Sequence, residues 1–168
     1  MGASDLIMYE EEFQKIKEVI SKLRVDANAK VVFLVDKNGQ QIAATGDLES
    51  LDTTSLASLT AGNVAATDGL AKLIGEREFS VLFHEGEKDN IHISIVGGKV
   101  ILVVIFDERS SLGLIRLRVK RSSDDLNKVF QQILEKTERE KAAGEVGAAF
   151  DSPFAEITDD DIDALFNE

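Results

Sequence analysis

Seven consecutive apolar residues, Val100 to Phe106, limit the possible fold more than any other stretch of the chain. Side chains of a strand point alternately to the two faces of its sheet, and this run ("VILVVIF") has no polar residue for either face. Such a strand belongs in the middle of a sheet that is covered on both sides. The chain has 168 residues, enough for one layered domain with a substantial core.

Three stretches have the spacing of apolar residues that is typical of helices. The first covers 10–24. The second begins at 52 or 53, where Asp or Thr can cap it, and ends at Gly75. In the third, residues 114–119 alternate like a strand, but a longer helical stripe favours one helix from about 111 to 138.

The sequence predicts five strands between the three helices. The first two flank Asn38-Gly39, a dipeptide typical of hairpins because both residues tolerate positive φ. The next two are "FSVLFHE" and "NIHISIV", and Gly97-Gly98 leads into the apolar run. The order is helix-strand-strand-helix-strand-strand-strand-helix, which predicts an α/β fold: a five-stranded, mostly antiparallel sheet with helices on both faces.

Negative charge is concentrated at the end of the chain. The net charge is −12, and residues 138–168 contribute −8 of it. We expect a domain over 1–138, a flexible linker over 139–151 and an acidic C-terminal docking motif over 152–168. The charge argues against nucleic acid as a partner, and the absence of a long apolar run argues against membrane insertion. A cytoplasmic protein is therefore expected.

The sequence offers little of the chemistry of an enzyme. It has no Cys, no phosphate-binding glycine loop and only two histidines, His84 and His92, which we interpret as ordinary strand residues. Asp36 and Asp107 each end a strand, and turn-capping is the preferred interpretation over a catalytic pair. We expect no catalytic, metal or cofactor residues. The basic residues around the last helix are interpreted as a solvated face: Arg109, Arg116, Arg118, Lys120 and Arg121.

A second unusual stretch is "TTSLASLTAGNVAAT", residues 53–67, which has no charge in a chain that is 30% charged. On a helical wheel, one side collects the leucines, and we expect this side to pack on the sheet: Leu56, Leu59, Asn63, Ala66, Leu70 and Leu73. The opposite side is small and mostly apolar: Ala57, Ala61, Val64, Ala65, Asp68 and Lys72. We favour an intermolecular surface for this second side. Burial inside a larger monomer is the alternative.

At these residues the chain resembles the roadblock/LC7 domain family. The motifs that carry the resemblance are "MYEEEF", "AKVVFLVDKNGQ", "DTTSLASLTAGNVAATDGLAKLIGE", "FHEGEKDNIHISIVG", "VILVVIFDERSSLGLIRLRVKR" and "SPFAEITDDDIDALF". They cover nearly the whole chain, and 138–150 is matched least.

The resemblance implies a roadblock/LC7 fold and a bacterial regulator of a Ras-like small GTPase of the MglA type. It implies a homodimer whose uncharged helices lie side by side and whose sheets join edge to edge, with one GTPase bound across the helices. It further implies GTPase activation without a donated arginine, nucleotide exchange promoted by the C-terminal segment, and a role in cell polarity and gliding motility, with the protein concentrated at a cell pole. A roadblock scaffold without effect on hydrolysis is the alternative.

Two sets of residues are the candidate GTPase contacts. The helix set is Ala57, Ala61, Val64, Ala65, Asp68 and Gly69, of which Ala61, Ala65 and Gly69 follow from the resemblance. The C-terminal set is Phe154, Ile157, Ile162, Leu165 and Phe166. In that segment, acids in the first turn and three apolar residues on one side favour a short helix that forms against a partner.

Overall fold

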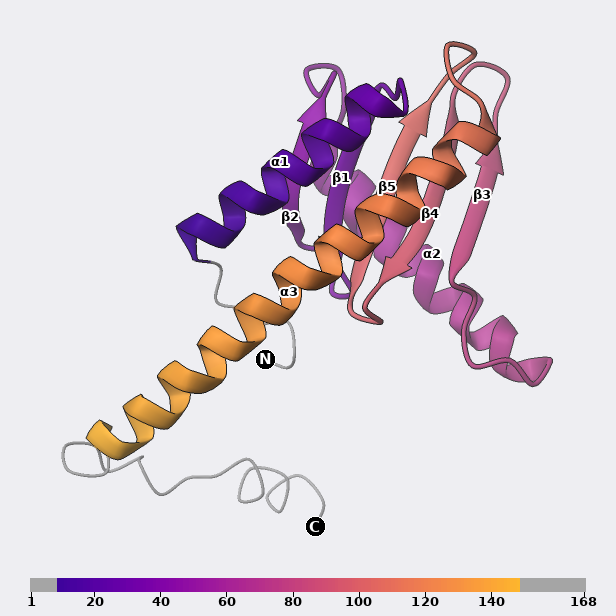
Figure 1. The fold of residues 1–168 in the computed structure, drawn as a ribbon. Helices are drawn as coiled ribbons and strands as arrows, with labels where there is room; N and C mark the ends of the chain where they lie inside the picture. The colour runs from indigo at the N-terminus through magenta and orange to yellow at the C-terminus, as the bar shows by residue number, and fades with distance from the viewer. Residues whose placement is uncertain (1–8, 149–168) are drawn as a thin grey trace.

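The computed structural model describes residues 9–148, which form three helices and one five-stranded sheet (Figure 1). The element order is the one that the sequence predicts. The elements are α1 (Glu10–Asp26), β1 (Val31–Asp36), β2 (Gln41–Gly46), α2 (Thr53–Leu73), β3 (Val81–Glu85), β4 (Asn90–Val96), β5 (Val100–Phe106) and α3 (Leu112–Ala148).

The sheet has the strand order β2-β1-β5-β4-β3, and every neighbouring pair is antiparallel. The apolar run of β5 is the central strand, and all seven of its residues are buried. Val104 belongs to the core cluster on one face, whereas its neighbour Val103 belongs to the cluster on the other. The prediction of a central strand covered on both faces is therefore confirmed.

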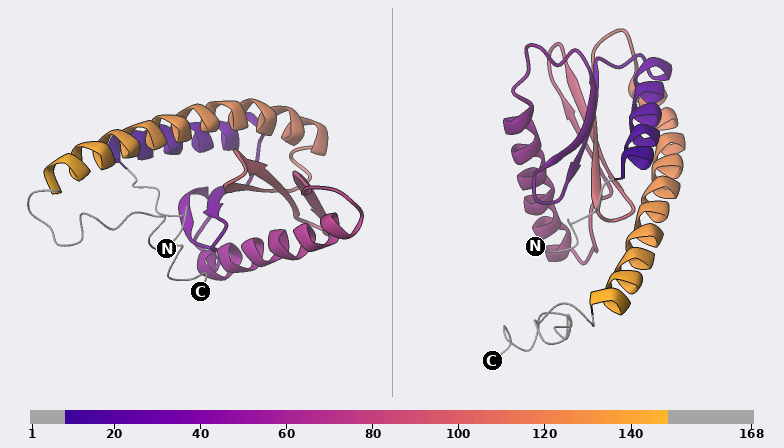
Figure 2. Two further views of the ribbon diagram at one scale, coloured as in Figure 1. Left: turned by 90° about the horizontal axis from the view of Figure 1, so that it is seen from below. Right: turned by 90° about the vertical axis from the view of Figure 1, so that its left-hand side faces the viewer.

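The molecule has three layers, with α1 and α3 on one face of the sheet and α2 alone on the other (Figure 2). The α1–α3 layer contributes long apolar residues to the larger core, among them Ile16, Ile20 and Ile133. α2 contributes Ala57, Ala61 and Val64 to the smaller one. Since α1 and α3 both lie on the opposite face, α2 has no second helix beside it in the described chain.

The ends of α2 follow the capping signals in the sequence. The Asp52 carboxylate accepts a hydrogen bond from the backbone N–H of Ser55 (3.1 Å) and another from the Ser55 hydroxyl (2.6 Å). These two bonds hold the pKa of Asp52 below its ordinary value. After Ile74, Gly75 adopts φ +84°, a left-handed conformation that ends the helix at low steric cost.

The β1–β2 turn differs from the expected hairpin in one respect. Gly39 has φ +91°, but Asn38 does not enter the positive-φ region. Instead, an Asp36 carboxylate oxygen accepts hydrogen bonds from the backbone N–H groups of Asn38 (2.9 Å) and Gln40 (3.0 Å). The interpretation of Asp36 as a turn-capping residue is confirmed.

α3 ends ten residues later than predicted, at Ala148, so its predicted end near Glu138 was wrong. Lys141, Ala142 and Ala143 are strong helix formers, and they outweigh the nearby glycines. The Tyr9 hydroxyl also donates a hydrogen bond to Glu140 (2.6 Å), which ties this part of α3 to the start of α1. The predicted linker over 139–151 is therefore helical as far as Ala148.

Candidate partner-binding site

α2 packs on the sheet with the side that the sequence analysis assigned to partners. Ala57 is 1% exposed, Ala61 is 8% exposed and Val64 is 3% exposed, and all three contact the core cluster beneath the helix. Leu59 and Leu70, which we expected on the sheet, point away from it. The predicted orientation of this helix was therefore wrong.

The reason for the reversal lies in the shape of the sheet. Its face under α2 already carries bulky side chains, including Phe33, Ile101 and Val103. A helix that packs closely over such a surface must present small residues, because leucines would hold it too far away. The same close approach appears at the β1–β2 turn, where a Cβ on Gly39 would lie 3.2 Å from Cα of Ser58.

The outward side of α2 is apolar and unprotected within the described chain. Leu59 is 72% exposed, Leu70 is 57% exposed and Leu73 is 83% exposed, and Ile74 follows at 69%. These are four of the seven large apolar residues that are exposed in the described residues. Solvated helices normally carry charged residues on such a side, so the exposure indicates a surface that another molecule covers.

Small residues lie between the exposed leucines. Ala65 and Ala66 are exposed, and a Cβ placed on Gly62 or Gly69 would meet no atom within 4 Å. A glycine inside a helix costs about 1 kcal/mol relative to alanine. Since the monomer has room for a side chain at both positions, the fold of one chain gives no reason for these two glycines.

One flank of α2 is polar. The Asn63 side-chain amide lies 3.0 Å from Nε2 of His84 on β3, and the Thr67 hydroxyl donates to the Asn63 and Val64 carbonyl oxygens (3.0 Å each). Asp68 is half-buried, and its Oδ1 has no hydrogen-bond partner within residues 9–148. This Oδ1 is a buried atom, so it is not an open acceptor on the outer surface of α2.

Of the predicted helix contacts, Ala65 and Gly69 are exposed, Asp68 is half-buried, and Ala57, Ala61 and Val64 are buried against the sheet. Gly62 and the outward leucines were not among the predicted contacts. Side-chain volume could have indicated the orientation, because a helix that packs over bulky strands needs its side with small residues inward. We define the outer α2 face as the accessible set Leu59, Gly62, Ala65, Ala66, Gly69, Leu70 and Leu73.

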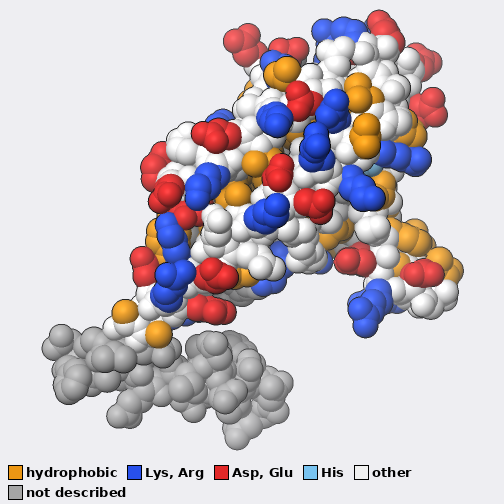
Figure 3. Space-filling view, in the orientation of Figure 1, with side chains coloured by type: hydrophobic (Ala, Val, Ile, Leu, Met, Phe, Trp, Pro, Cys, Tyr) orange, Lys and Arg blue, Asp and Glu red, His pale blue; other side chains and the backbone are white. Residues whose placement is uncertain are grey.

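Basic residues lie mostly on the other side of the sheet. Arg116, Arg118 and Arg121 are on α3, in the layer opposite α2 (Figure 2). The face of α1 and α3 carries basic and acidic side chains intermixed (Figure 3). Arg109, in the loop before α3, is held by the Asp107 carboxylate (Nε to Oδ1, 3.0 Å).

Arg109 and the neighbouring backbone N–H hold the pKa of Asp107 below its ordinary value. The bond from the Arg109 backbone N–H to Asp107 Oδ1 is the turn capping that the sequence predicts, and the ion pair with the Arg109 side chain adds to it. On the α2 side, the exposed Arg77 follows the helix in the loop to β3 and is not among the predicted basic residues.

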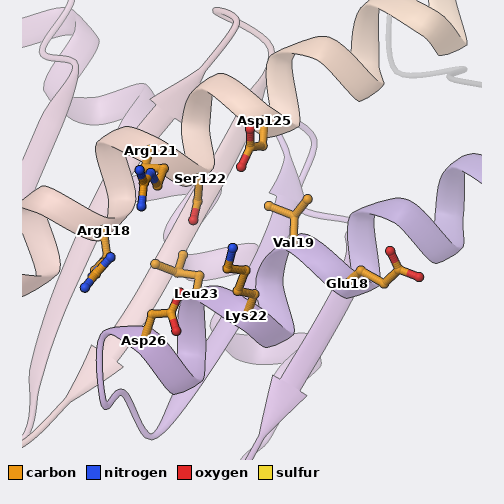
Figure 4. A pocket seen from close by; sticks show the side chains of 9 residues that line it. All are labelled: Glu18, Val19, Lys22, Leu23, Asp26, Arg118, Arg121, Ser122 and Asp125. Atoms are coloured by element: carbon orange, nitrogen blue, oxygen red, sulfur yellow. The ribbon is translucent and has the colours of Figure 1, made fainter.

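A narrow groove lies between α1 and α3 (Figure 4). Its volume is about 190 Å³, and its lining has three acids and three basic residues: Glu18, Asp26, Asp125, Lys22, Arg118 and Arg121. Balanced charge of this kind suits the contact of two helices of one chain better than a site for an anionic ligand.

Within residues 9–148, no helix is long and apolar enough to cross a bilayer. The same residues hold no group of three or more metal-ligating side chains. The predicted C-terminal contacts lie outside the described residues: Phe154, Ile157, Ile162, Leu165 and Phe166.

Comparisons with known proteins agree with this architecture. The profile of the Roadblock/LC7 domain family matches residues 15–106. The structure of Myxococcus xanthus MglB is similar, with 64% sequence identity and a TM-score of 0.72 over 76% of this chain and 96% of that one.

Two further solved structures are similar over nearly their whole length. A gliding protein MglB from Thermus thermophilus is 32% identical, with a TM-score of 0.71 over 76% of this chain and 97% of that one. A structure described as MglB with a tetrameric arrangement is 30% identical, with a TM-score of 0.73 over 77% and 97%. No curated protein matches the chain.

Proposed function

Because this chain belongs to the Roadblock/LC7 domain family and is similar to MglB proteins, we propose that it is a homodimeric GTPase-activating protein. Its partner is a Ras-like small GTPase of the MglA type, one molecule per dimer. The role is that of a regulator in cell polarity and gliding motility, in the cytoplasm and concentrated at a cell pole.

The outer α2 face is the observation that carries this proposal. It is apolar, uncharged and uncovered within residues 9–148. In the dimer, the leucines of two such faces cover one another, and the glycines and alanines let the backbones approach closely or leave a shallow surface for the GTPase. The backbone of the edge strand β3 supplies the adjoining sheet edge.

Activation proceeds without an arginine from this protein. A GTPase seated on the outer α2 face is separated from Arg116, Arg118 and Arg121 by the whole thickness of the sheet (Figure 2). These arginines cannot reach its nucleotide without a rearrangement of the layers. We propose that the bound GTPase instead rearranges its own catalytic residues, and that binding energy from the α2 contact stabilises that arrangement.

The acidic C-terminal segment provides a second contact. Three apolar residues at helical spacing, Ile162, Leu165 and Phe166, suit a helix that forms in a groove of the partner. A segment tethered to a dimer that already holds the GTPase acts at a high effective concentration. We assign to it tighter association and the promotion of nucleotide exchange.

The test is GTP hydrolysis by the cognate MglA-type GTPase, measured with and without this protein. Two exposed leucines offer a matched pair of variants: Leu70→Arg places a charge on the outer α2 face, and Leu117→Arg places one on α3 at similar exposure (57% and 63%). We expect stimulation with the wild type and with Leu117→Arg, and its loss with Leu70→Arg.

Light scattering on both variants separates loss of the dimer from loss of GTPase binding. Equal stimulation by the two variants would remove the outer α2 face from the proposal. Tight binding with no change in hydrolysis would instead support the scaffold alternative.

A further inference from the structure

A second cavity lies on the opposite side of the sheet from α2. It has a volume of about 450 Å³ and lies between α3 and the outer strands β3 and β4. This volume is within the range of pockets that hold small organic molecules. The cavity plays no part in the proposed GTPase contact, because the sheet separates the two.

The floor of this cavity is made of buried polar groups. His92 is 2% exposed and Ser94 is 6% exposed, and they are two residues apart on β4, so both point to the α3 side. Within the described chain, neither imidazole nitrogen of His92 has a hydrogen-bond partner, and neither does the Ser94 hydroxyl. Buried polar groups are nearly always satisfied, so three unpartnered atoms on residues that line one cavity mark a place where water or a ligand supplies the missing hydrogen bonds.

The rim of the cavity is cationic. Arg116 and Lys120 are exposed and one helical turn apart on α3, and Ser123 follows on the same side. Asp124 is the one acid in the lining, and it lies at the far end of this helical side. The two cations therefore give the entrance a net positive charge.

The walls between floor and rim are apolar. Val81 from β3 and Val119 from α3 both line the cavity. Burial and the nearby Arg116 lower the pKa of His92, so the imidazole is neutral at pH 7 and offers one donor and one acceptor. The site thus combines a cationic entrance, apolar walls and a floor that can donate and accept hydrogen bonds.

We propose that this cavity binds a small amphiphilic anion, a phosphate monoester or carboxylate with an aromatic or aliphatic body. The anionic group binds Arg116 and Lys120 at the rim, where bidentate contact with a guanidinium is favourable. The body lies against Val81 and Val119, and a polar end of the molecule meets His92 and Ser94. Binding here is independent of GTPase regulation.

The two histidines of the chain make the test specific. His84 lies on the other face of the sheet, against Asn63 of α2, and serves as an internal reference for His92. Full-length protein is titrated with phenyl phosphate, phenol and inorganic phosphate while the imidazole ¹⁵N shifts of both residues are followed. We expect phenyl phosphate to shift the His92 signals with a Kd of about 1 mM or tighter, and phenol and inorganic phosphate to bind at least about tenfold more weakly.

Variants distinguish the cavity from general surface attraction. Arg116→Gln should weaken the binding of phenyl phosphate about tenfold and leave the binding of phenol unchanged, because only the anion forms the charge-assisted hydrogen bond. Lys128→Gln removes an exposed cation of α3 outside the cavity and should leave affinity within about twofold. Ser94→Ala, a change that keeps the packing, should weaken the binding of phenyl phosphate severalfold.

Three results would overturn the proposal. The first is no His92 shift at about 10 mM phenyl phosphate. The second is equal changes in the imidazole ¹⁵N shifts of His84 and His92. The third is an equal loss of affinity for phenyl phosphate in Arg116→Gln and Lys128→Gln. GTP hydrolysis measured on the same variants should be unchanged, which keeps this inference separate from the proposed function.

Discussion

The inner side of α2 holds alanines and a valine, whereas its outer side holds leucines and glycines. On the inner side, Ala57, Ala61 and Val64 let the helix lie close to the bulky residues of the sheet. On the outer side, Leu59, Leu70 and Leu73 are left in solvent within the described chain. The larger apolar side chains thus lie where a second molecule is needed to cover them, and side-chain size alone does not identify the core-facing side.

The largest expected effect comes from placing the same charge on the two sides. Ala61→Arg buries an unpaired guanidinium against the sheet, at a cost on the order of 3–5 kcal/mol, a large part of a typical domain stability. Ala65→Arg on the exposed side should change unfolding by less than about 0.5 kcal/mol and weaken GTPase binding at least tenfold. Urea unfolding and binding assays check both, and a stable Ala61→Arg protein would contradict the orientation of α2.

The second prediction asks whether the outer α2 face suffices for the partner. Ending the chain at Asp151 should leave the folded domain and the dimer unchanged and weaken GTPase association roughly tenfold to hundredfold, through lost effective concentration. Changing Ile162, Leu165 and Phe166 together to Ser should have the same effect. If affinity, hydrolysis and nucleotide release all match those of the full chain, the tail is a solubilising segment only.

The third prediction concerns whether a partner approaches the backbone of α2 at the small residues of its outer side. Gly62→Ala and Gly69→Ala should each raise the stability of the helix by up to about 1 kcal/mol, because the monomer has room for the methyl group. They should also weaken self-association or GTPase binding, since a methyl group prevents the closest backbone approach. Gly144→Ala on α3 is the matched control: it should stabilise without affecting binding. A gain in stability with unchanged binding would mean that the partner does not approach these glycines.

The fourth prediction contrasts the apolar contact of α2 with the charged contact of α1 and α3. Lys136 lies 2.5 Å from the buried Glu12 carboxylate, and this bond lowers the pKa of Glu12 below its ordinary value of 4.5. A carboxyl whose pKa is lowered by folding contributes stability above pH 4.5 and loses it as the pH falls through the folded value. No ion pair of residues 9–148 involves α2.

Between about pH 5 and pH 3, hydrogen exchange should therefore show α1 loosening from α3, while α2 loses only the Asp52 cap at its first turn and stays on the sheet. Glu12→Gln should flatten this acid dependence while lowering stability at neutral pH. If hydrogen exchange in α1 depends on pH in the same way in the variant, other carboxyl groups cause the dependence.

The smallest effect is expected for the arginines, on both sides of the sheet. Ala at Arg77, Arg109, Arg116, Arg118 or Arg121, tested singly, should leave GTPase stimulation within about threefold, whereas a donated arginine finger is worth about 10³–10⁵ in rate. Arg77 is the most exacting case because it lies beside the end of α2. If one of these substitutions removed stimulation by a factor of about 10³ or more while binding stayed intact, that arginine would be donated directly to the nucleotide, and the rearrangement mechanism would be wrong.

The sequence by itself determined the order of the elements, the central position of β5 and the ends of α2. These depend on local chemistry: alternation of side chains, capping by Asp52 and the positive φ of Gly75. The absence of charge over 53–67 also indicated a helix with two apolar sides. The end of α3 was missed because the local helix formers Lys141, Ala142 and Ala143 were given too little weight beside the glycines, and because contacts such as Tyr9 with Glu140 join residues far apart in the chain.

Only the tertiary structure decided which side of α2 faces the sheet and that His92 and Ser94 line a cavity. A helical wheel gives the composition of each side of a helix and nothing about the surface that the helix meets. That surface is built by β1, β4 and β5 from residues far away in the sequence, and its bulk admits alanines where leucines would clash. The fit between the two surfaces, rather than the hydrophobicity of either, fixed the orientation and left the leucines exposed.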